Sequence, residues 1–235
     1  METEILNLLK RNPVQNLPVL GFFENYPLEK HIVYGSSMIL IGNSDYSWAY
    51  LSVVDENELD VLLGMFAYES LYFANVEEWM IPSLTKKHRV EWKLATHRYY
   101  LPGEVEILPM DYEWTPLQES MVNYIFKHSP YKDFTSEAYI KQRLHKDISA
   151  GIWVDDKLVA WGLTHDDGSL GFLNVLSGYR GQGMGELVFT SLILAKRQKQ
   201  KPIFVNVEAH NKQSVKLLSK LGFIYDRPIS WIKLV

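Results

Sequence analysis

The chain of 235 residues contains no cysteine. Without thiols it can form neither disulfides nor zinc–thiolate sites, and it has no thiol nucleophile, so we expect a cytoplasmic protein. Its seven histidines show no HExxH pattern and no paired spacing, so the sequence predicts no metal site. No run of 18 apolar residues occurs, and we expect no membrane-spanning helix. The first residues, METEILNLLKRNPVQ, are too acidic and too interrupted for a secretory signal peptide.

An excess of basic residues is also missing. The 28 aspartates and glutamates outnumber the 24 lysines and arginines, which gives a net charge of −4. Domains that bind nucleic acid usually carry an excess of positive charge, so we expect neither a nucleic acid nor a membrane as a partner. Hydrophobic residues make up 47% of the chain, which is enough for the core of one large domain or two small ones.

Three glycines, Gly181, Gly183 and Gly185, stand at alternate positions in the stretch LNVLSGYRGQGMGELVFTSL. A strand-like run precedes them and a long helical run follows. Glycine permits positive φ and lets another group approach the backbone closely. The N-terminus of a helix attracts anions through its free N–H groups and its dipole. The stretch therefore favours a ligand that carries phosphate, although a simple tight turn would use the same residues.

Single positions distinguish three nucleotide-binding patterns here. The Gly-Lys-Ser/Thr of a Walker A loop is absent, and a Rossmann fingerprint would need a glycine where Glu186 stands. The third pattern, Arg/Gln-x-x-Gly-x-Gly/Ala, is matched by residues 180–185. It is the pyrophosphate loop of the Gcn5-related N-acetyltransferases, the GNAT superfamily, which this stretch resembles.

The N-terminal half reads as a mixture of helices and strands. We expect a helix over 2–10, a strand pair over 31–43, a strand over 47–56, a turn leading into a buried strand over 56–66, a helix over 75–82 and a strand over 91–102. Its glycines are isolated, so this half has no glycine loop of its own.

From residue 104 onward the expected order is β-α-α-β-β-β-loop-α-β-α-β. The elements are a short strand over 104–110, a helix capped by Thr115, a helix capped by Thr135 or Ser136, three antiparallel strands over 150–176 with turns at Asp155-Asp156 and Asp167-Gly168, a helix over about 185–200, a strand over 202–210, a helix closed by Gly222 and a final strand. The predicted domains are 1–103 and 104–235, both α/β with a mixed α+β sheet.

This order is the GNAT order, and FLNVLSGYRGQGMG, VNVEAHNKQSVKLLSKLGF and the closing strand resemble segments of that superfamily. The resemblance implies a GNAT acyl-CoA N-acyltransferase fold for the C-terminal domain. A narrower resemblance, to the glycine N-acyltransferase or FR47-like family, rests on HIVYGSSMILIGNSDYSWAYLSVVDE, YIKQRLHKDISAGIW and YDRPISWIKL. In that family the N-terminal half is a smaller, degenerate GNAT-like domain. We therefore expect this half to bind no CoA and to cover the acceptor side of the active site.

The superfamily resemblance implies acetyl-CoA or another acyl-CoA as co-substrate, without a metal. By analogy, the N–H groups of the loop would hold the pyrophosphate and the preceding strand end would pair with the pantetheine arm. Asn211 would lie near that arm, although it would also suit a helix N-cap. The implied cofactor-binding residues are Val175, Leu176, Ser177, Arg180, Gly181, Gln182, Gly183, Met184, Gly185, Glu186, Asn211 and Ser214.

The catalytic residues follow the family less well. Members often have a glutamate base on the strand before the loop and a tyrosine acid on the helix after the asparagine, but these positions hold Ser169 and Leu218. Neither side chain suits that proton transfer. The predicted catalytic residues are instead Glu208 and Asp167 as bases and Tyr179 as acid, with Asp166, His165, His210, Ser214 and Tyr225 as further candidates. Strand-face carboxylates and turn-forming aspartates are also common without any catalytic role.

We expect an N-acetyltransferase (N-acyltransferase) that moves an acetyl or short acyl group from acyl-CoA to a primary amine, by direct transfer in a ternary complex. The acceptor would be a small molecule such as an amino acid, and the protein a monomer or homodimer. The alternatives are a non-catalytic acyl-CoA-binding sensor, a protein lysine or N-terminal acetyltransferase, and an interaction protein whose N-terminal half carries the function.

Overall fold

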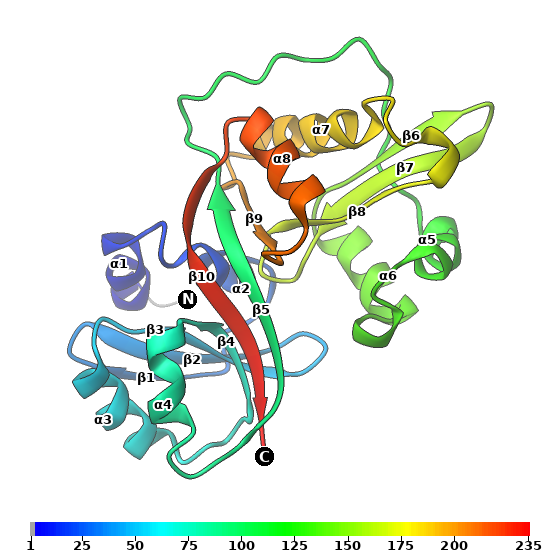
Figure 1. The fold of residues 1–235 in the computed structure, drawn as a ribbon. Helices are drawn as coiled ribbons and strands as arrows, with labels where there is room; N and C mark the ends of the chain where they lie inside the picture. Colours follow the sequence, from blue (N-terminus) through cyan, green and yellow to red (C-terminus); the bar gives the residue numbers. More distant parts are fainter. Residues whose placement is uncertain (1–2) are drawn as a thin grey trace. The chain divides into compact units, whose positions relative to one another are not determined.

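The structure is a computed structural model that describes residues 3–235 (Figure 1). Its contacts group the chain into two compact units. Unit 1 holds the residues up to Arg98 together with Val207–Asn211 and Tyr225–Val235, and unit 2 holds Tyr99–Asn206 and Lys212–Ile224. The predicted domains are continuous segments whereas these units are not, and the limit at residue 103 stays a prediction. Among residues 3–235, no helix combines the length and the hydrophobicity needed to cross a membrane.

Helices and strands alternate in both units, as expected for the α/β class. Unit 1 contains α1 (Thr3–Arg11), α2 (Leu17–Asn25), β1 (Lys30–Tyr34), β2 (Ser37–Asn43), β3 (Ser47–Ser52), α3 (Glu56–Phe66), β4 (Tyr72–Val76), the 3-10 helix η1 (Glu78–Met80) and α4 (Ile81–Leu84). Unit 2 contains η2 (Glu119–Met121), α5 (Val122–His128), η3 (Lys132–Phe134), α6 (Glu137–Lys146), β6 (Ser149–Val154), β7 (Lys157–Thr164), β8 (Leu170–Val175), η4 (Ser177–Tyr179), α7 (Met184–Gln198) and α8 (Lys212–Lys220). Residues of both units occur in β5 (Val90–Tyr100), β9 (Phe204–Val207) and β10 (Ile224–Leu234). The two strand orders are β1-β2-β3-β4-β10-β5-β9 and β6-β7-β8.

The sheet of unit 1 is apolar on both faces. Successive residues of a strand point to opposite sides of the sheet, and on β2 they are apolar on both. On β2, Ile39 and Ile41 belong to a core cluster with residues of α3 and α4. Met38 and Leu40 belong to a second cluster with residues of α1 and α2. Helices therefore cover both faces of this sheet, which explains why its strands read as continuous hydrophobic runs.

The segment 56–66 is a helix, and the predicted turn and buried strand were wrong. Asp55 caps its N-terminus by accepting a hydrogen bond from the Glu58 N–H at 2.9 Å. The buried residues of α3 recur at helical spacing: Leu59, Leu62, Leu63 and Phe66. The cap and this spacing outweigh the strand-like appearance of the VLLGMF run.

Three further expectations near Pro82 and Thr115 were wrong in whole or in part. Of the helix predicted over 75–82, residues 75 and 76 complete β4, whereas η1 and α4 are helical. The helix does not stop at Pro82, which lies in the first turn of α4, where proline is favoured. The strand expected over 104–110 does not form. Thr115 caps no helix, because its backbone pairs with Gly151 at 2.8 and 3.1 Å and the helix begins at Val122.

The rest of unit 2 follows the expected order. Ser136, one of two predicted caps, accepts a hydrogen bond from the Tyr139 N–H at the start of α6. Three antiparallel strands, β6, β7 and β8, turn at Asp155-Asp156 and at Gly168, and all three of these residues have positive φ. The helix α7 packs on one face of this sheet, and the hydrophobic residues of α5 and α6 pack on the other.

Unit 2 also contains a buried cluster of charges beneath α6 and α7. Asp147 and Lys196 are 1% and 2% exposed at their side chains, and Arg143 is fully buried. The Asp147 carboxylate lies 3.0 Å from Lys201 Nζ, 3.6 Å from Arg143 Nη2 and 4.0 Å from Lys196 Nζ. Burial by itself raises the pKa of Asp147, but the three cations outweigh it and the pKa is lowered.

This lowered pKa predicts how stability depends on pH. Ionised Asp147 stabilises the fold fully above the unfolded pKa of about 3.9, and the stabilisation is lost as the pH falls through the folded pKa. In Asp147→Asn, urea unfolding should therefore give a free energy that depends less steeply on pH below about 4 than in the wild type. Asp156→Asn, in an exposed turn, should keep the wild-type slope. Equal slopes in wild type and Asp147→Asn would contradict the prediction.

Candidate functional site

The predicted glycine loop connects β8 to the N-terminus of α7 (Figure 1). Gly181 and Gly183 have φ values of 76° and 80°, a region that side chains other than glycine rarely adopt. A Cβ added at either residue would meet no atom within 4 Å. These glycines are therefore needed for the backbone conformation, and the space beside them is open.

Backbone N–H groups along this loop lack acceptors. Within the described part of the chain, those of residues 181–185 donate to no protein group. The next two, from Glu186 and Leu187, both donate to the Gly183 carbonyl at 2.9 and 3.1 Å. Consecutive N–H groups in such a turn form a concavity that binds anions, and the dipole of the 15-residue helix α7 adds to its positive potential. The loop can therefore hold a phosphate group through its backbone.

The strand that leads into this loop has one unpaired edge. In the sheet β6-β7-β8, the strand β8 has a partner on one side only. The Leu176 N–H donates to Val159 at 2.9 Å, so the alternation of an antiparallel pair directs the N–H and C=O of Val175 away from β7. Arg180 Nε donates to this Val175 carbonyl at 3.0 Å. An extended ligand with amide groups can add to such an edge as a further strand would.

Unit 1 repeats the order of elements of unit 2 but has neither its glycine loop nor its unpaired strand edge. Its β1-β2-β3-α3-β4 corresponds to β6-β7-β8-α7-β9, yet β3 and β4 are paired in parallel, whereas β8 and β9 lie in different sheets. The N-terminus of α3 is capped by Asp55, and Glu56 and Glu58 follow in its first turn. Asp55 accepts a hydrogen bond from the Glu58 N–H, and the three carboxylates together repel an anion. The comparison favours unit 2 as the ligand-binding unit.

The other predicted cofactor-binding residues lie around the loop and on α8. Glu186, in the first turn of α7, forms an ion pair with Lys220 Nζ at 2.5 Å, which offsets its negative charge near the loop. Gln182 Nε2 donates to the Gly178 carbonyl at 3.1 Å and so supports the turn. Ser214 is half-buried on α8. Asn211 precedes α8, and its N–H donates to the Glu208 carbonyl.

The predicted catalytic residues are divided between the units. Glu208 follows β9 in unit 1, and its side chain is 25% exposed, with an oxygen 3.5 Å from His210 Nδ1. Tyr179 lies in unit 2, half-buried in the turn before the loop, and Lys157 Nζ is 6.0 Å from its ring centroid. The two family positions are both buried. Ser169 is 1% exposed, and Leu218 is fully buried on α8. Neither Ser169 nor Leu218 supplies an acid or a base, as expected from the sequence.

Asp167, the third predicted catalytic residue, is 1% exposed and already accepts three hydrogen bonds. Ser169 donates twice to its Oδ1, from the N–H at 2.8 Å and from Oγ at 2.6 Å. Asn206 Nδ2 donates to its Oδ2 at 3.0 Å. Burial raises the pKa of Asp167, although the bonds from Ser169 partly oppose this effect. These contacts join β9 to the turn before β8, where no backbone ladder does so, and the sequence did not indicate Asn206.

A β-bulge interrupts β8 close to this turn. The register with β7 shifts between Trp161 and Leu163, and Phe172 has a φ of 51°. The His165 ring packs against Gly171 and lies 4.7 Å from the Phe172 ring. Burial lowers the pKa of His165 to about 4, so this imidazole is neutral at pH 7. A bulky residue at positive φ costs about 1–3 kcal/mol, and such strain collects at functional sites.

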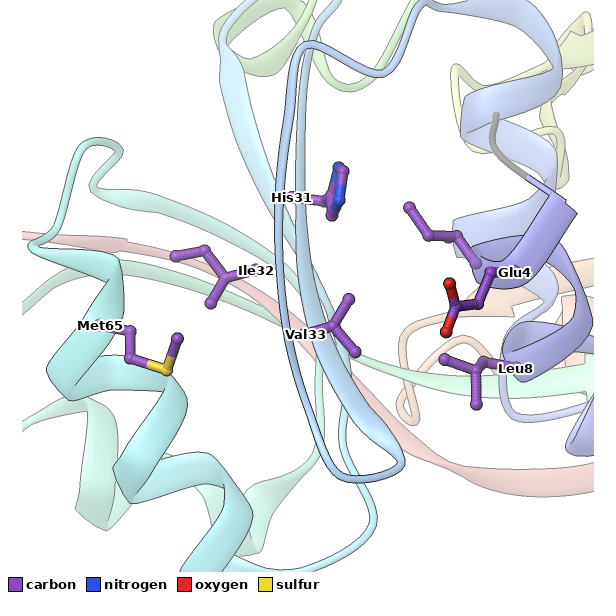
Figure 2. A pocket seen from close by; sticks show the side chains of 7 residues that line it. Glu4, Leu8, His31, Ile32, Val33 and Met65 are labelled. Atoms are coloured by element: carbon purple, nitrogen blue, oxygen red, sulfur yellow. The ribbon is translucent and has the colours of Figure 1, made fainter.

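Two other features of the described residues add no chemistry. No group of three or more histidines, aspartates and glutamates within 3–235 could hold a metal ion. A depression of about 430 Å³ in unit 1 is lined by Glu4, Ile5, Leu8, His31, Ile32, Val33 and Met65. Figure 2 shows Glu4 and Leu8 of α1 on one side of β1 and Met65 of α3 on the other.

Comparisons with known proteins agree with this arrangement. Residues 150–232 match the model of the family described as FR47-like protein. A sequence search of curated proteins found no match. Among solved structures, a Drosophila protein has a TM-score of 0.79 at 18% identity, with 99% of this chain and 95% of that chain covered.

Two GNAT structures have the same fold. A putative acetyltransferase of the GNAT family from Novosphingobium aromaticivorans has a TM-score of 0.61 at 14% identity, covering 92% of this chain and 96% of that one. A tandem GNAT protein from the clavulanic acid biosynthesis pathway has a TM-score of 0.53 at 12% identity, covering 93% and 87%. The predicted α/β fold is thus confirmed: the chain has the GNAT fold, and its residues 150–232 match the FR47-like family model.

Proposed function

We propose that the protein is an N-acyltransferase that moves an acetyl or short acyl group from acyl-CoA to the primary amine of a small molecule, such as an amino acid. The observation that carries this proposal is the unpaired edge of β8 running into the row of free N–H groups at the start of α7. Acyl-CoA has the same order of groups, because its pantetheine arm carries two amides and leads to a pyrophosphate. Arg180 must share the Val175 carbonyl with this arm or release it.

The reaction requires a proton acceptor, a polarised carbonyl and a proton donor. We assign the acceptor to Glu208, which takes the proton that the attacking amine loses. The amine nitrogen bonds to the thioester carbon, the carbon–sulfur bond breaks, and the CoA thiolate takes a proton from Tyr179, which solvent then restores. Backbone N–H groups at the bulge around Phe172 are suited to polarise the thioester carbonyl. In the proposed reaction the transfer is direct, in a ternary complex, and without cysteine the chain has no thiol that could carry the acyl group.

Glu208→Gln should lower kcat about 100-fold, within the range found for general bases, with little change in the KM for acyl-CoA. The amide keeps the shape of the side chain but cannot accept the proton. A matched control is Glu91→Gln on β5, which removes an exposed carboxylate paired with Lys233 and should leave kcat unchanged. Initial rates across pH would measure both, and a near-normal kcat would remove Glu208 from the mechanism.

A non-catalytic acyl-CoA sensor is the second candidate, because Ser169 and Leu218 occupy the positions of the usual glutamate and tyrosine. A protein lysine or N-terminal amine is the alternative acceptor. The enzyme and the sensor would both bind CoA, and calorimetric titration with CoA tests this binding. We expect one CoA per chain, bound by unit 2 alone, and stoichiometries of zero or two would contradict the proposed site.

A further inference from the structure

Asn206, the third residue of β9, has a side-chain oxygen without a partner. Its Nδ2 donates to Asp167 Oδ2 at 3.0 Å. Its Oδ1 is covered and accepts no hydrogen bond from the residues described, 3–235. Buried acceptors in folded proteins are nearly always paired, so either an ordered water or a group of a ligand is expected to donate to this oxygen.

The orientation of this amide is fixed by its neighbour. Asp167 Oδ1 already accepts two hydrogen bonds from Ser169, and its Oδ2 faces Asn206. Turning the amide over would bring an oxygen against the carboxylate oxygen, so Asn206 must present its NH₂ group to Asp167. The Asn206 oxygen therefore points away from Asp167.

Asp167 in turn is held rigidly. Its own N–H donates to Asp166 Oδ1 at 3.0 Å, and the next carbonyl, of Gly168, accepts from the buried Lys196 Nζ. These contacts fix the turn directly before β8, the strand whose edge is unpaired. Through its bond to Asp167, Asn206 of β9 is thus held next to the start of β8.

We propose that Asn206 contacts the substrate, with its side-chain oxygen accepting a hydrogen bond from a substrate N–H, and that Asp167 is the residue that positions it. The inference rests on the proposed function. The oxygen can only accept, so it selects an N–H donor and disfavours carbonyl or phosphate oxygens. Two such donors exist in the reaction, an amide of the pantetheine arm and the attacking amine.

The test uses four variants of this pair. Asn206→Leu removes the acceptor at nearly constant size and should raise about 10-fold the KM of the substrate whose N–H it binds, as expected for the loss of one hydrogen bond. Asp167→Asn leaves Asn206 in place but frees its amide to turn, and should raise the same KM severalfold. Asn206→Asp alone sets two carboxylates together and should be the most impaired.

The exchanged pair, Asp167→Asn with Asn206→Asp, is the matched control. It restores one donor and one acceptor between the side chains and leaves a carboxylate oxygen in place of the free amide oxygen. We expect both KM values to return to within about 3-fold of the wild type, because one hydrogen bond again fixes residue 206. A role confined to folding would lower the melting temperature of the single variants without changing either KM.

Separate KM values distinguish the donors, and the Kd for CoA is the second readout. A raised KM and Kd for acyl-CoA would support the inference with pantetheine as donor, and a raised KM for the amine alone would support it with the amine. If the wild type binds CoA and turns over while Asn206→Leu changes neither KM, the inference is wrong. If Asn206→Leu does not fold, the exchanged pair provides the test. The inference is then wrong if Asp167→Asn raises a KM and the exchanged pair does not restore it. A wild type that binds no CoA refutes the proposed function instead.

Discussion

Replacing Gly181 and Gly183 together by valine is expected to lower kcat/KM for acyl-CoA by up to about 1,000-fold. Left-handed φ costs a residue with a Cβ about 1–2 kcal/mol, so two valines at φ values near those of Gly181 and Gly183 cost about 2–4 kcal/mol. Any change of the turn also removes backbone bonds to the pyrophosphate, and each bond to a charged group contributes about 1.5–3 kcal/mol. The variant either bears this strain when it binds or loses these bonds, so the smaller cost sets the loss, and about 4 kcal/mol corresponds to about 1,000-fold.

The same loop provides the control for this variant. Gly178 is also exposed with no atom within 4 Å of an added Cβ, but its φ is not positive. Gly178→Ala should therefore retain kcat/KM within about 3-fold, since it strains nothing and leaves the N–H groups of residues 181–185 in place. Initial rates at varied acyl-CoA, with circular dichroism to confirm folding, measure both variants. Comparable losses in the two would mean that mere bulk in the loop matters, not the backbone conformation.

Arg98→Met is expected to reduce the free energy of unfolding by about 3–5 kcal/mol, the usual cost of breaking a buried ion pair. Arg98, on β5, is fully buried, and its Nε and Nη2 donate to Asp226 of β10 at 2.8 and 2.6 Å. Its Nη1 donates to the Gln15 carbonyl and to Asn75 Oδ1. Methionine fills the volume but leaves the carboxylate and two further acceptors without this donor. Denaturant unfolding measures the loss.

A second ion pair between the same two strands gives the comparison. Lys233 of β10 lies 2.9 Å from Glu91 of β5, but both side chains are substantially exposed to solvent. Lys233→Met should cost only about 0–1 kcal/mol, because water stabilises exposed charges nearly as well as their partners do. Equal effects of Arg98→Met and Lys233→Met would contradict the weight given to the buried network. Asp226→Leu combined with Arg98→Met should recover part of the loss, since it removes the carboxylate that keeps only its hydrogen bond from Arg227 Nε at 3.1 Å.

Local signals made much of unit 2 predictable from the sequence. Alternating glycines, aspartates at turns and a serine before a helical run each have a strong short-range preference, and the loop, the hairpins and the cap at Ser136 formed where these stand. The GNAT order of elements after residue 135 followed from them. Because such features depend on neighbouring residues, they need no knowledge of the tertiary contacts.

Features set by distant contacts were missed. The run over 56–66 is dense in apolar residues and looks like a buried strand, and only the Asp55 cap and packing against the sheet reveal a helix. Thr115 has the local pattern of a helix cap, but its backbone is used by Gly151, 36 residues later. The bond between Asp167 and Asn206 spans 39 positions, and no sequence pattern marks Asn206 as a partner of Asp167. The bulge at Phe172 is likewise a property of pairing.

Release of CoA thiol from acetyl-CoA in the presence of pooled amines and amino acids tests the central claim most directly. A chromogenic disulfide reports the thiol, and the protein itself adds no background because it has no cysteine. We predict release that depends on both enzyme and amine and that disappears in the valine variant of Gly181 and Gly183. CoA binding without release from any amine or peptide pool would contradict the assignment as an acyltransferase and leave a protein that only binds the cofactor.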